Sequence, residues 1–239
     1  MRTVSILSAA LIAAFPLAAQ APAKEKPAPA AAHANHDPDH AAHGGALPAG
    51  WSARVDRGDA ANIKLAPMGG GLHVTMGPAA ILWRDADRVN GPFHTVASFA
   101  RTKAPAHAEA YGLFYGGTAL NGEGQKYTYF LVRGDGSFLV RERNGAETRN
   151  VSSGWTENAA VNRADASGKV TDKLEIDASK AGTVRFLANG KVVHEMAADA
   201  NAINGIVGLR VNHNLDIHVD GFEVHKVAEG QPAGAATRQ

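Results

Sequence analysis

The sequence contains no cysteine and carries almost no net charge. Without cysteine there can be no disulfide and no lipid anchor attached through a thiol, so the fold must be stabilised by burial of apolar side chains alone. The formal net charge at pH 7 is only +1. A chain this balanced lacks the positive field that draws proteins to nucleic acid or to anionic membranes. The composition therefore argues against both kinds of partner.

One long apolar run stands at the N terminus. It extends from Val4 to Ala19, follows the basic Arg2 and ends at the small residues of Ala19-Gln20-Ala21. This layout is typical of a secretory signal peptide, and the run is short and rich in alanine for a transmembrane span. We predict a signal peptide at residues 1–21, with an uncleaved N-terminal anchor as the alternative. The mature chain is then periplasmic or extracellular and has no membrane span.

Residues 22–50 consist almost entirely of alanine, proline, glycine, histidine and charged residues, and Leu47 is their only large aliphatic side chain. Such a segment cannot bury enough apolar surface to offset the entropy of ordering it, so we predict a disordered linker. Its imidazoles, with Asp37 and Asp39 between them, could bind Zn²⁺ or Cu²⁺. A solvated linker that merely tolerates histidine is the alternative. The candidate metal ligands are His33, His36, His40 and His43.

Residues 51–227 have a different character, with many short β-strand patterns separated by glycine, proline, asparagine and aspartate. A helical turn is expected only at 197–203, and the longest interruption, 158–169, is expected to wrap a sheet edge. Strands without alternating helices predict an all-β, two-sheet antiparallel sandwich of the jelly-roll type. Residues 228–239 are predicted to be a disordered tail. The expected strands cover 51–56, 62–66, 72–76, 79–83, 93–101, 108–115, 126–133, 138–143, 146–151, 173–177, 183–188, 192–196, 206–212 and 215–225.

The clearest pattern is the stretch 126–145, KYTYFLVRGDGSFLVRERNG. Its first half alternates between two kinds of side chain, as a strand with two different faces does. Asp135-Gly136 and Asn144-Gly145 offer the positive-φ residues that tight primed turns need. The stretch therefore predicts a β-meander of three strands.

Four segments, 173–177, 182–193, 205–211 and 219–224, resemble the C-terminal half of concanavalin A-like lectin and glucanase jelly rolls. In those domains a strand leads to a hairpin with an Asn-Gly turn and a Gly-x-x-Gly-Leu strand, and the last strand returns beside the first. The resemblance is closest to bacterial secreted 3-keto-disaccharide hydrolase-type domains. It implies a carbohydrate or glycoside ligand. Such domains often hold Ca²⁺ near the first and last strands, which here makes Asp56 and Asp220 candidate ligands.

The residues that would carry hydrolysis are missing from the matching positions. The stretch 110–117 has neither the Asn-Ser-Gly strand nor the aromatic-Glu pair of the hydrolase-type domains. Glu175-Ile176-Asp177 begins the Glu-x-Asp-x-x-Glu pattern of the glucanases, but Lys180 stands where the acid/base carboxylate belongs. Retaining cleavage needs two carboxylates on one strand face. We therefore assign no catalytic residue and expect Glu175 and Asp177 to face solvent.

A sugar site needs flat aromatic rings beside fixed hydrogen-bonding groups. All four tyrosines of the chain fall within 111–129, and strand alternation places them in two pairs, the second sharing its face with Arg133. If these faces coincide, they form a ligand platform; the alternative is that the tyrosines pack against each other across strands. Trp155 either plugs the core or stands beside the ligand. The candidate ligand-binding residues are Tyr111, Tyr115, Tyr127, Tyr129, Arg133, Trp155, Arg210 and Asn212.

The leading functional hypothesis is a secreted carbohydrate-binding, lectin-like module, noncatalytic or catalytically cryptic, that recognises a glycan or glycoside on a concave sheet. The first alternative is a glycoside hydrolase-type enzyme that acts on (3-keto-)glycosides. The second is a structural or protein-binding sandwich.

Overall fold

The computed structural model describes residues 47–227. The predicted signal peptide, the linker up to residue 46 with its four histidines, and the predicted tail at 228–239 lie outside the described residues. Between residues 47 and 227 no helix is long and apolar enough to span a membrane.

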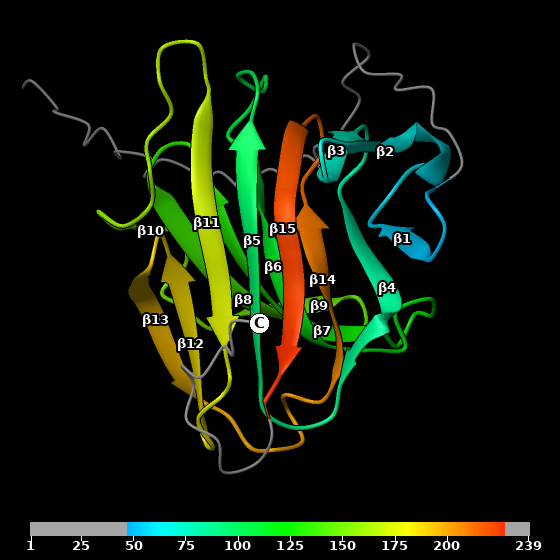
Figure 1. The fold of residues 1–239 in the computed structure, drawn as a ribbon, viewed down its shortest axis with the longest axis vertical. Helices are drawn as coiled ribbons and strands as arrows, with labels where there is room; N and C mark the ends of the chain where they lie inside the picture. Colours follow the sequence, from blue (N-terminus) through cyan, green and yellow to red (C-terminus); the bar gives the residue numbers. More distant parts are fainter. Residues whose placement is uncertain (1–46, 228–239) are drawn as a thin grey trace, which may run out of the picture. The chain divides into compact units, whose positions relative to one another are not determined.

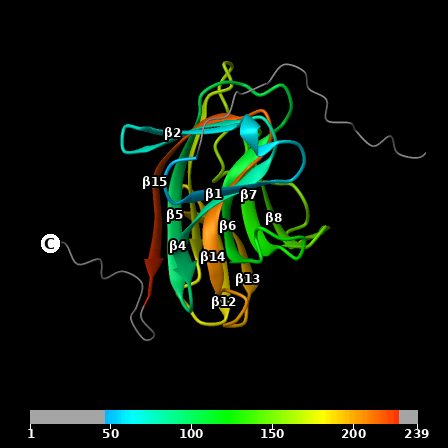
Figure 2. The ribbon, with the colours of Figure 1, turned by 90° about the vertical axis from the view of Figure 1, so that its right-hand side faces the viewer.

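Two antiparallel β-sheets lie face to face, as Figures 1 and 2 show. The eight-stranded sheet has the order β1-β4-β14-β6-β7-β8-β10, with β9 also paired to β8. Its strands are β1 (Trp51–Val55), β4 (Ala80–Val89), β6 (Ala110–Thr118), β7 (Lys126–Arg133), β8 (Ser137–Asn144), β9 (Glu147–Asn150), β10 (Thr156–Glu157) and β14 (Gly205–Val211). This arrangement confirms the prediction of an all-β, two-sheet sandwich.

The seven-stranded sheet has the order β13-β12-β11-β5-β15-β3-β2. Its strands are β2 (Ile63–Met68), β3 (Gly71–Met76), β5 (Phe93–Arg101), β11 (Val170–Asp177), β12 (Thr183–Ala188), β13 (Lys191–Ala197) and β15 (Asp216–Lys226). The two C-terminal strands insert among early ones: β14 lies between β4 and β6, and β15 lies between β5 and β3. The resemblance implied that the last strand returns beside the first. Instead, β15 lies beside β3 and β5, and β1 belongs to the other sheet.

The main core fills the space between the sheets. Along β5 every second side chain is buried, which is the period of a strand with one face on a core. Phe99 from this strand stacks on Tyr111 of the opposite sheet, with 5.4 Å between ring centroids. Tyr115 also contacts Phe186 of β12 across the sheets, in a tilted arrangement with 6.2 Å between ring centroids. Burying each such ring stabilises the fold by about 1.5–3 kcal/mol, so these inter-sheet contacts hold the layers together.

A second apolar layer covers the outer face of the eight-stranded sheet, the face turned away from the other sheet. All its members come from that sheet or from the loop between β6 and β7. They are Ile81, Trp83, Ala110, Phe114, Leu120, Tyr127, Tyr129, Leu131 and Ile206. This sheet is therefore apolar on both sides. A sheet with one solvated face usually alternates apolar and polar residues, so an apolar outer face is unusual.

Gly208 of β14 creates the space in which the Phe114 ring lies. A Cβ added there would stand 2.5 Å from Phe114 Cε1 and 2.5 Å from the carbonyl oxygen of Leu82. We expect Gly208→Ala to destabilise the fold by about 1–3 kcal/mol, the usual cost of overpacking. Gly124→Ala is the control, since a Cβ at Gly124 meets nothing within 4 Å. Urea denaturation measures both changes, and equal stability of the two variants would contradict the assigned packing.

The predicted meander is present as β7, β8 and β9, and of its two predicted primed turns only the second has the geometry of one. Only the glycine of each predicted pair has positive φ, +85° at Gly136 and +61° at Gly145. Because Arg133 pairs with Ser137, the first loop has three residues and needs one left-handed position, at its end. The second loop has two residues with glycine first, which suits a type II′ turn.

Two other boundaries also differ from the sequence prediction. Leu47, placed in the linker, packs against the core, so the ordered domain begins before Trp51. The stretch expected to contain a helical turn instead holds the end of β13 and several turns.

Candidate functional site

The structure separates the four tyrosines into two pairs that lie on opposite faces of one sheet. Tyr111 and Tyr115 belong to the core between the sheets, whereas Tyr127 and Tyr129 belong to the outer layer. The reason is the register of β6 and β7: Tyr129 pairs with Phe114, not with either tyrosine of β6. The condition for a shared ligand platform, that the faces of the two tyrosine pairs coincide, is therefore not met.

Tyr111 and Tyr115 are structural residues. The Tyr111 hydroxyl donates to Asp172 Oδ2 at 3.1 Å, and burial, reinforced by this carboxylate, raises the pKa of Tyr111 well above its ordinary value. Burial raises the pKa of Tyr115 to about 12. The other oxygen of Asp172 accepts from the Asn162 backbone amide at 2.9 Å and from Asn189 Nδ2 at 2.8 Å. These bonds satisfy a carboxylate that is fully buried between the sheets.

Tyr127 and Tyr129 lie on the outer face, but side chains cover them. Their ring centroids are 5.6 Å apart, and Tyr127 also packs on Phe114 at 5.3 Å. Only 4% of Tyr127 and 6% of Tyr129 is exposed. The guanidinium carbon of Arg210 lies 5.8 Å from the centre of the Tyr129 ring. The two rings therefore form a packed base beneath polar side chains, not an open stacking surface.

An ion pair closes over this base. Arg210 Nη1 donates to Asp56 Oδ1 at 3.0 Å, its second terminal nitrogen donates to Oδ2, and Arg143 Nη1 lies 3.4 Å from the same carboxylate. Asp56 directly follows β1, the strand that crosses the view of Figure 2 in front of β14 and β6. Burial alone would raise the pKa of Asp56, but the hydrogen bonds and charge of Arg210 outweigh it, so the pKa lies below its ordinary value.

Two more arginines lie on this face. Arg54 of β1 donates from Nη1 to the carbonyl oxygen of Leu120 at 3.3 Å. Arg141 of β8 is the cross-strand partner of Tyr129, so it stands on the same face. Within residues 47–227 the side chain of Arg141 makes no hydrogen bond or ion pair, and its Nε is buried. Neither residue was among the candidates predicted from the sequence, although alternation along β8 places Arg141 on the same face as Arg143.

At one end of the face Arg133 stacks on Trp155. The guanidinium carbon lies 3.8 Å from the indole centroid, and Arg133 is held by Ser137 Oγ at 3.3 Å and by Asp135 Oδ2 at 3.3 Å. Trp155 is 37% exposed, and it is the one exposed residue among the phenylalanines, tyrosines and tryptophans within residues 47–227. Of the two roles that the sequence left open for Trp155, plugging the core does not fit this exposure.

Asn212 stands just beyond the end of β14, where its backbone amide donates to the Ala110 carbonyl at 2.9 Å. Next to it, Glu109 is buried and its Oε1 lies 3.0 Å from His213 Nε2. Burial raises the pKa of Glu109 although His213 opposes the shift. This pair could not be foreseen, because neither residue belongs to a recognisable motif.

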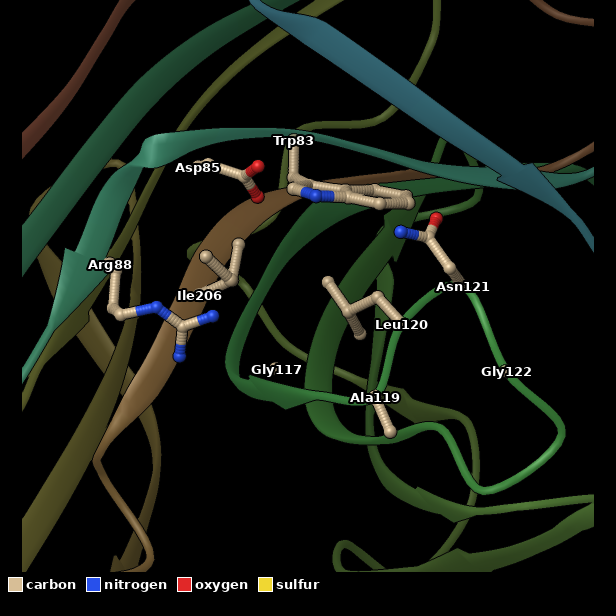
Figure 3. Close-up of a pocket in the computed structure, with 9 residues that line it drawn as sticks. All are labelled: Trp83, Asp85, Arg88, Gly117, Ala119, Leu120, Asn121, Gly122 and Ile206. Atoms are coloured by element: carbon tan, nitrogen blue, oxygen red, sulfur yellow. The ribbon is translucent and has the colours of Figure 1, made fainter.

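A small pocket occupies the other end of the outer face. Its volume is about 230 Å³, below the range of about 300–1,000 Å³ that is usual for small-molecule sites, so it can hold one small unit of a ligand. Figure 3 shows the Asp85 carboxylate and the Arg88 guanidinium on one side of the Trp83 indole and the Asn121 amide on the other. The lining residues are Trp83, Asp85, Arg88, Gly117, Ala119, Leu120, Asn121, Gly122 and Ile206.

The remaining candidates lie elsewhere. Glu175 and Asp177 project from the face of β11 opposite the core, where His94 lies 2.9 Å from Glu175 and Arg185 pairs with Asp177. The proposed calcium ligands belong to different sheets: Asp56 pairs with Arg210, and Asp220 of β15 lies 3.1 Å from His218. Among residues 47–227 no three acidic or histidine side chains cluster in a way that could hold a metal ion.

Comparison with known proteins gives the fold. No protein-family model and no curated protein sequence matches the chain. A carbohydrate-binding module, CBM66 from Bacillus subtilis, superimposes with a TM-score of 0.55 at 10% identity, over 74% of this chain and 96% of that one. The fold is a concanavalin A-like jelly roll.

Two further jelly rolls match less closely. The carbohydrate recognition domain of Emp46p has a TM-score of 0.49 and 12% identity, covering 75% of this chain and 89% of its own. A protein of unknown function with a galectin-like fold from Bacillus subtilis has a TM-score of 0.45 and 11% identity, over 74% and 89%.

Proposed function

We propose that this jelly roll is an exported, noncatalytic carbohydrate-binding module that holds its glycan on the outer face of the eight-stranded sheet. The observation that carries the proposal is Trp155, an exposed indole fixed in place by a stacked guanidinium. The similarity in fold to a carbohydrate-binding module of Bacillus subtilis supports the same class of ligand.

The arrangement suits a sugar on physical grounds. A pyranose ring has an apolar C–H side that packs on a flat aromatic ring, and hydroxyl edges that need donors and acceptors. Trp155 supplies the ring at one end of the face, and Arg133 lies against it with part of its side chain exposed. The pocket at the other end offers a carboxylate, a guanidinium and an amide for a second sugar unit.

The hydrolase alternative has less support. The two carboxylates that begin the glucanase pattern, Glu175 and Asp177, lie on the outer face of the other sheet, away from Trp155. Both are also held by neighbouring cationic or histidine side chains there.

Trp155→Ala tests the proposed function. On a glycan array followed by calorimetry, we expect this variant to lose about tenfold or more in affinity, the usual effect of removing an aromatic anchor. Its melting temperature should change little, because Trp155 is not part of the core. Val192→Ala is the control, since Val192 is an exposed apolar residue of β13 on the other sheet. Failure of the wild type to bind any glycan, or full affinity in the Trp155 variant, would refute the proposal.

A further inference from the structure

Four arginines converge on the outer face of the eight-stranded sheet. Strand pairing places Arg54, Arg141, Arg143 and Arg210 opposite members of the outer apolar layer, so all four side chains project from the same face. Asp56 is the carboxylate that lies among them, and it already pairs with Arg143 and Arg210. Four positive charges thus face one negative charge at this arginine cluster.

The hydrogen-bond donors of the cluster outnumber their acceptors as well. The Nε atoms of Arg54, Arg141 and Arg210 are buried and have no hydrogen-bond partner within the described residues. Arg210 is itself 93% buried, being only 7% exposed. Buried donors are nearly always paired in native proteins, so three unpaired guanidinium nitrogens on one face require an explanation.

An anion supplies what the cluster lacks. Carboxylate and sulfate groups carry negative charge and several acceptor oxygens, and they match the fork of a guanidinium group. Asp56 does not serve Arg141: its hydrogen bonds go to Arg210 and Arg143, and Arg141 Nε has no partner among the described residues. Arg141 stands beside Tyr129, over which Arg210 also lies, so an anion at Arg141 approaches the centre of the cluster.

We propose that the ligand of this face is an acidic glycan, whose carboxylate or sulfate group is received by Arg141 within the arginine cluster. This inference rests on the proposed function, and it adds the chemical class of the ligand. The net charge of the whole chain is only +1, so the attraction is local to this face and does not arise from a generally basic protein. The sugar ring contacts Trp155 while its acidic group pairs with arginine.

The test compares polymers that differ only in charge. Polygalacturonate is titrated beside the same polymer after methyl esterification, and dextran sulfate beside dextran. The full chain should bind at least one acidic member about tenfold or more tightly than its neutral counterpart, and this preference should shrink as salt is added. The two pairs show whether carboxylate or sulfate is the preferred group.

The variant Arg141→Gln tests whether the preference for acidic polymers depends on Arg141. Affinity for the acidic polymer should fall about tenfold, the scale of a charge-assisted hydrogen bond, while the weaker binding of the neutral polymer is unchanged. Arg141→Lys should retain part of the preference. Lys64→Gln removes one positive charge from an exposed position of β2 on the other sheet and should have no effect. Thermal melts check that the variants fold, which we expect because Arg141 has no partner to lose.

The outcomes separate the two proposals. Equal affinity for charged and uncharged polymers, lost in both cases on Trp155→Ala, overturns the acidic ligand and leaves glycan binding in place. Unchanged acidic binding in the Arg141→Gln variant overturns the role of the cluster. Absence of binding to every polymer and every array glycan overturns both.

Discussion

Replacing Tyr127 by alanine is expected to destabilise the fold by about 3–5 kcal/mol, as does the truncation of other buried aromatic residues. The ring contacts Phe114 and Tyr129 and is 96% buried, since only 4% of the residue is exposed. Its removal leaves a cavity beneath the Arg210–Asp56 pair that the sheet cannot close. Chemical denaturation with linear extrapolation gives the change in free energy of unfolding.

Tyr127→Phe is the matched control. It keeps the ring and removes a hydroxyl that donates no hydrogen bond to another described side chain, so we expect a change of less than about 1 kcal/mol. A small loss of stability for Tyr127→Ala, together with a large loss of glycan affinity, would show instead that this ring is an open stacking surface. That result would contradict the packed base described above.

Asp56→Ala is expected to cost about 3–5 kcal/mol, because it leaves the guanidinium group of Arg210 buried without its partner. Glu157→Gln is the control: its ion pair with Arg163 is well exposed and should contribute at most about 1 kcal/mol. In the double variant Asp56→Ala/Arg210→Met much of the lost stability should return, since no unpaired charge remains. Equal losses in the Asp56 and Glu157 variants would contradict the assigned burial of Arg210.

The same ion pair gives a pH dependence. The pKa of Asp56 is lower in the folded protein than in the unfolded chain, where it is about 3.9. Its contribution to stability is therefore complete above about pH 4 and is lost as the pH falls through the lower folded-state value. Between about pH 5 and pH 2 the wild type should lose more stability than the Asp56→Ala/Arg210→Met variant.

Much of the fold could be predicted from local patterns. Alternation along 126–133 correctly placed Tyr127, Tyr129 and Arg133 on one face, because strand periodicity is a local property. The register of β6 and β7 decides which residues of the two strands lie opposite one another, and local sequence patterns do not determine that register. In that register Tyr111 pairs with Val132 and Tyr115 pairs with Thr128, and cross-strand partners point to the same side of a sheet. The tyrosines of β6 therefore lie on the side opposite to those of β7.

The candidate site was harder to predict, because its decisive contacts join distant parts of the chain. Asp56 and Arg210 are 154 positions apart, and no local pattern relates them. Arg133 and Trp155 were both candidates, but only the structure shows that they stack. Arg141 was missed because an arginine in a strand usually faces solvent. What distinguishes it is a buried Nε without a hydrogen-bond partner, which only the structure shows.

The most direct measurement is an NMR titration of the isotope-labelled chain with an acidic oligosaccharide such as trigalacturonate, observing the indole N–H signals of tryptophan and the Nε–H signals of arginine. We predict that the signals of Trp155 and Arg141 shift together and saturably, and that backbone signals of β11, β12 and β13 on the other sheet stay in place. Shifts centred on that other sheet, or no shift at Trp155 and Arg141 with either this ligand or the best glycan of the array, would contradict a ligand site on the outer face of the eight-stranded sheet.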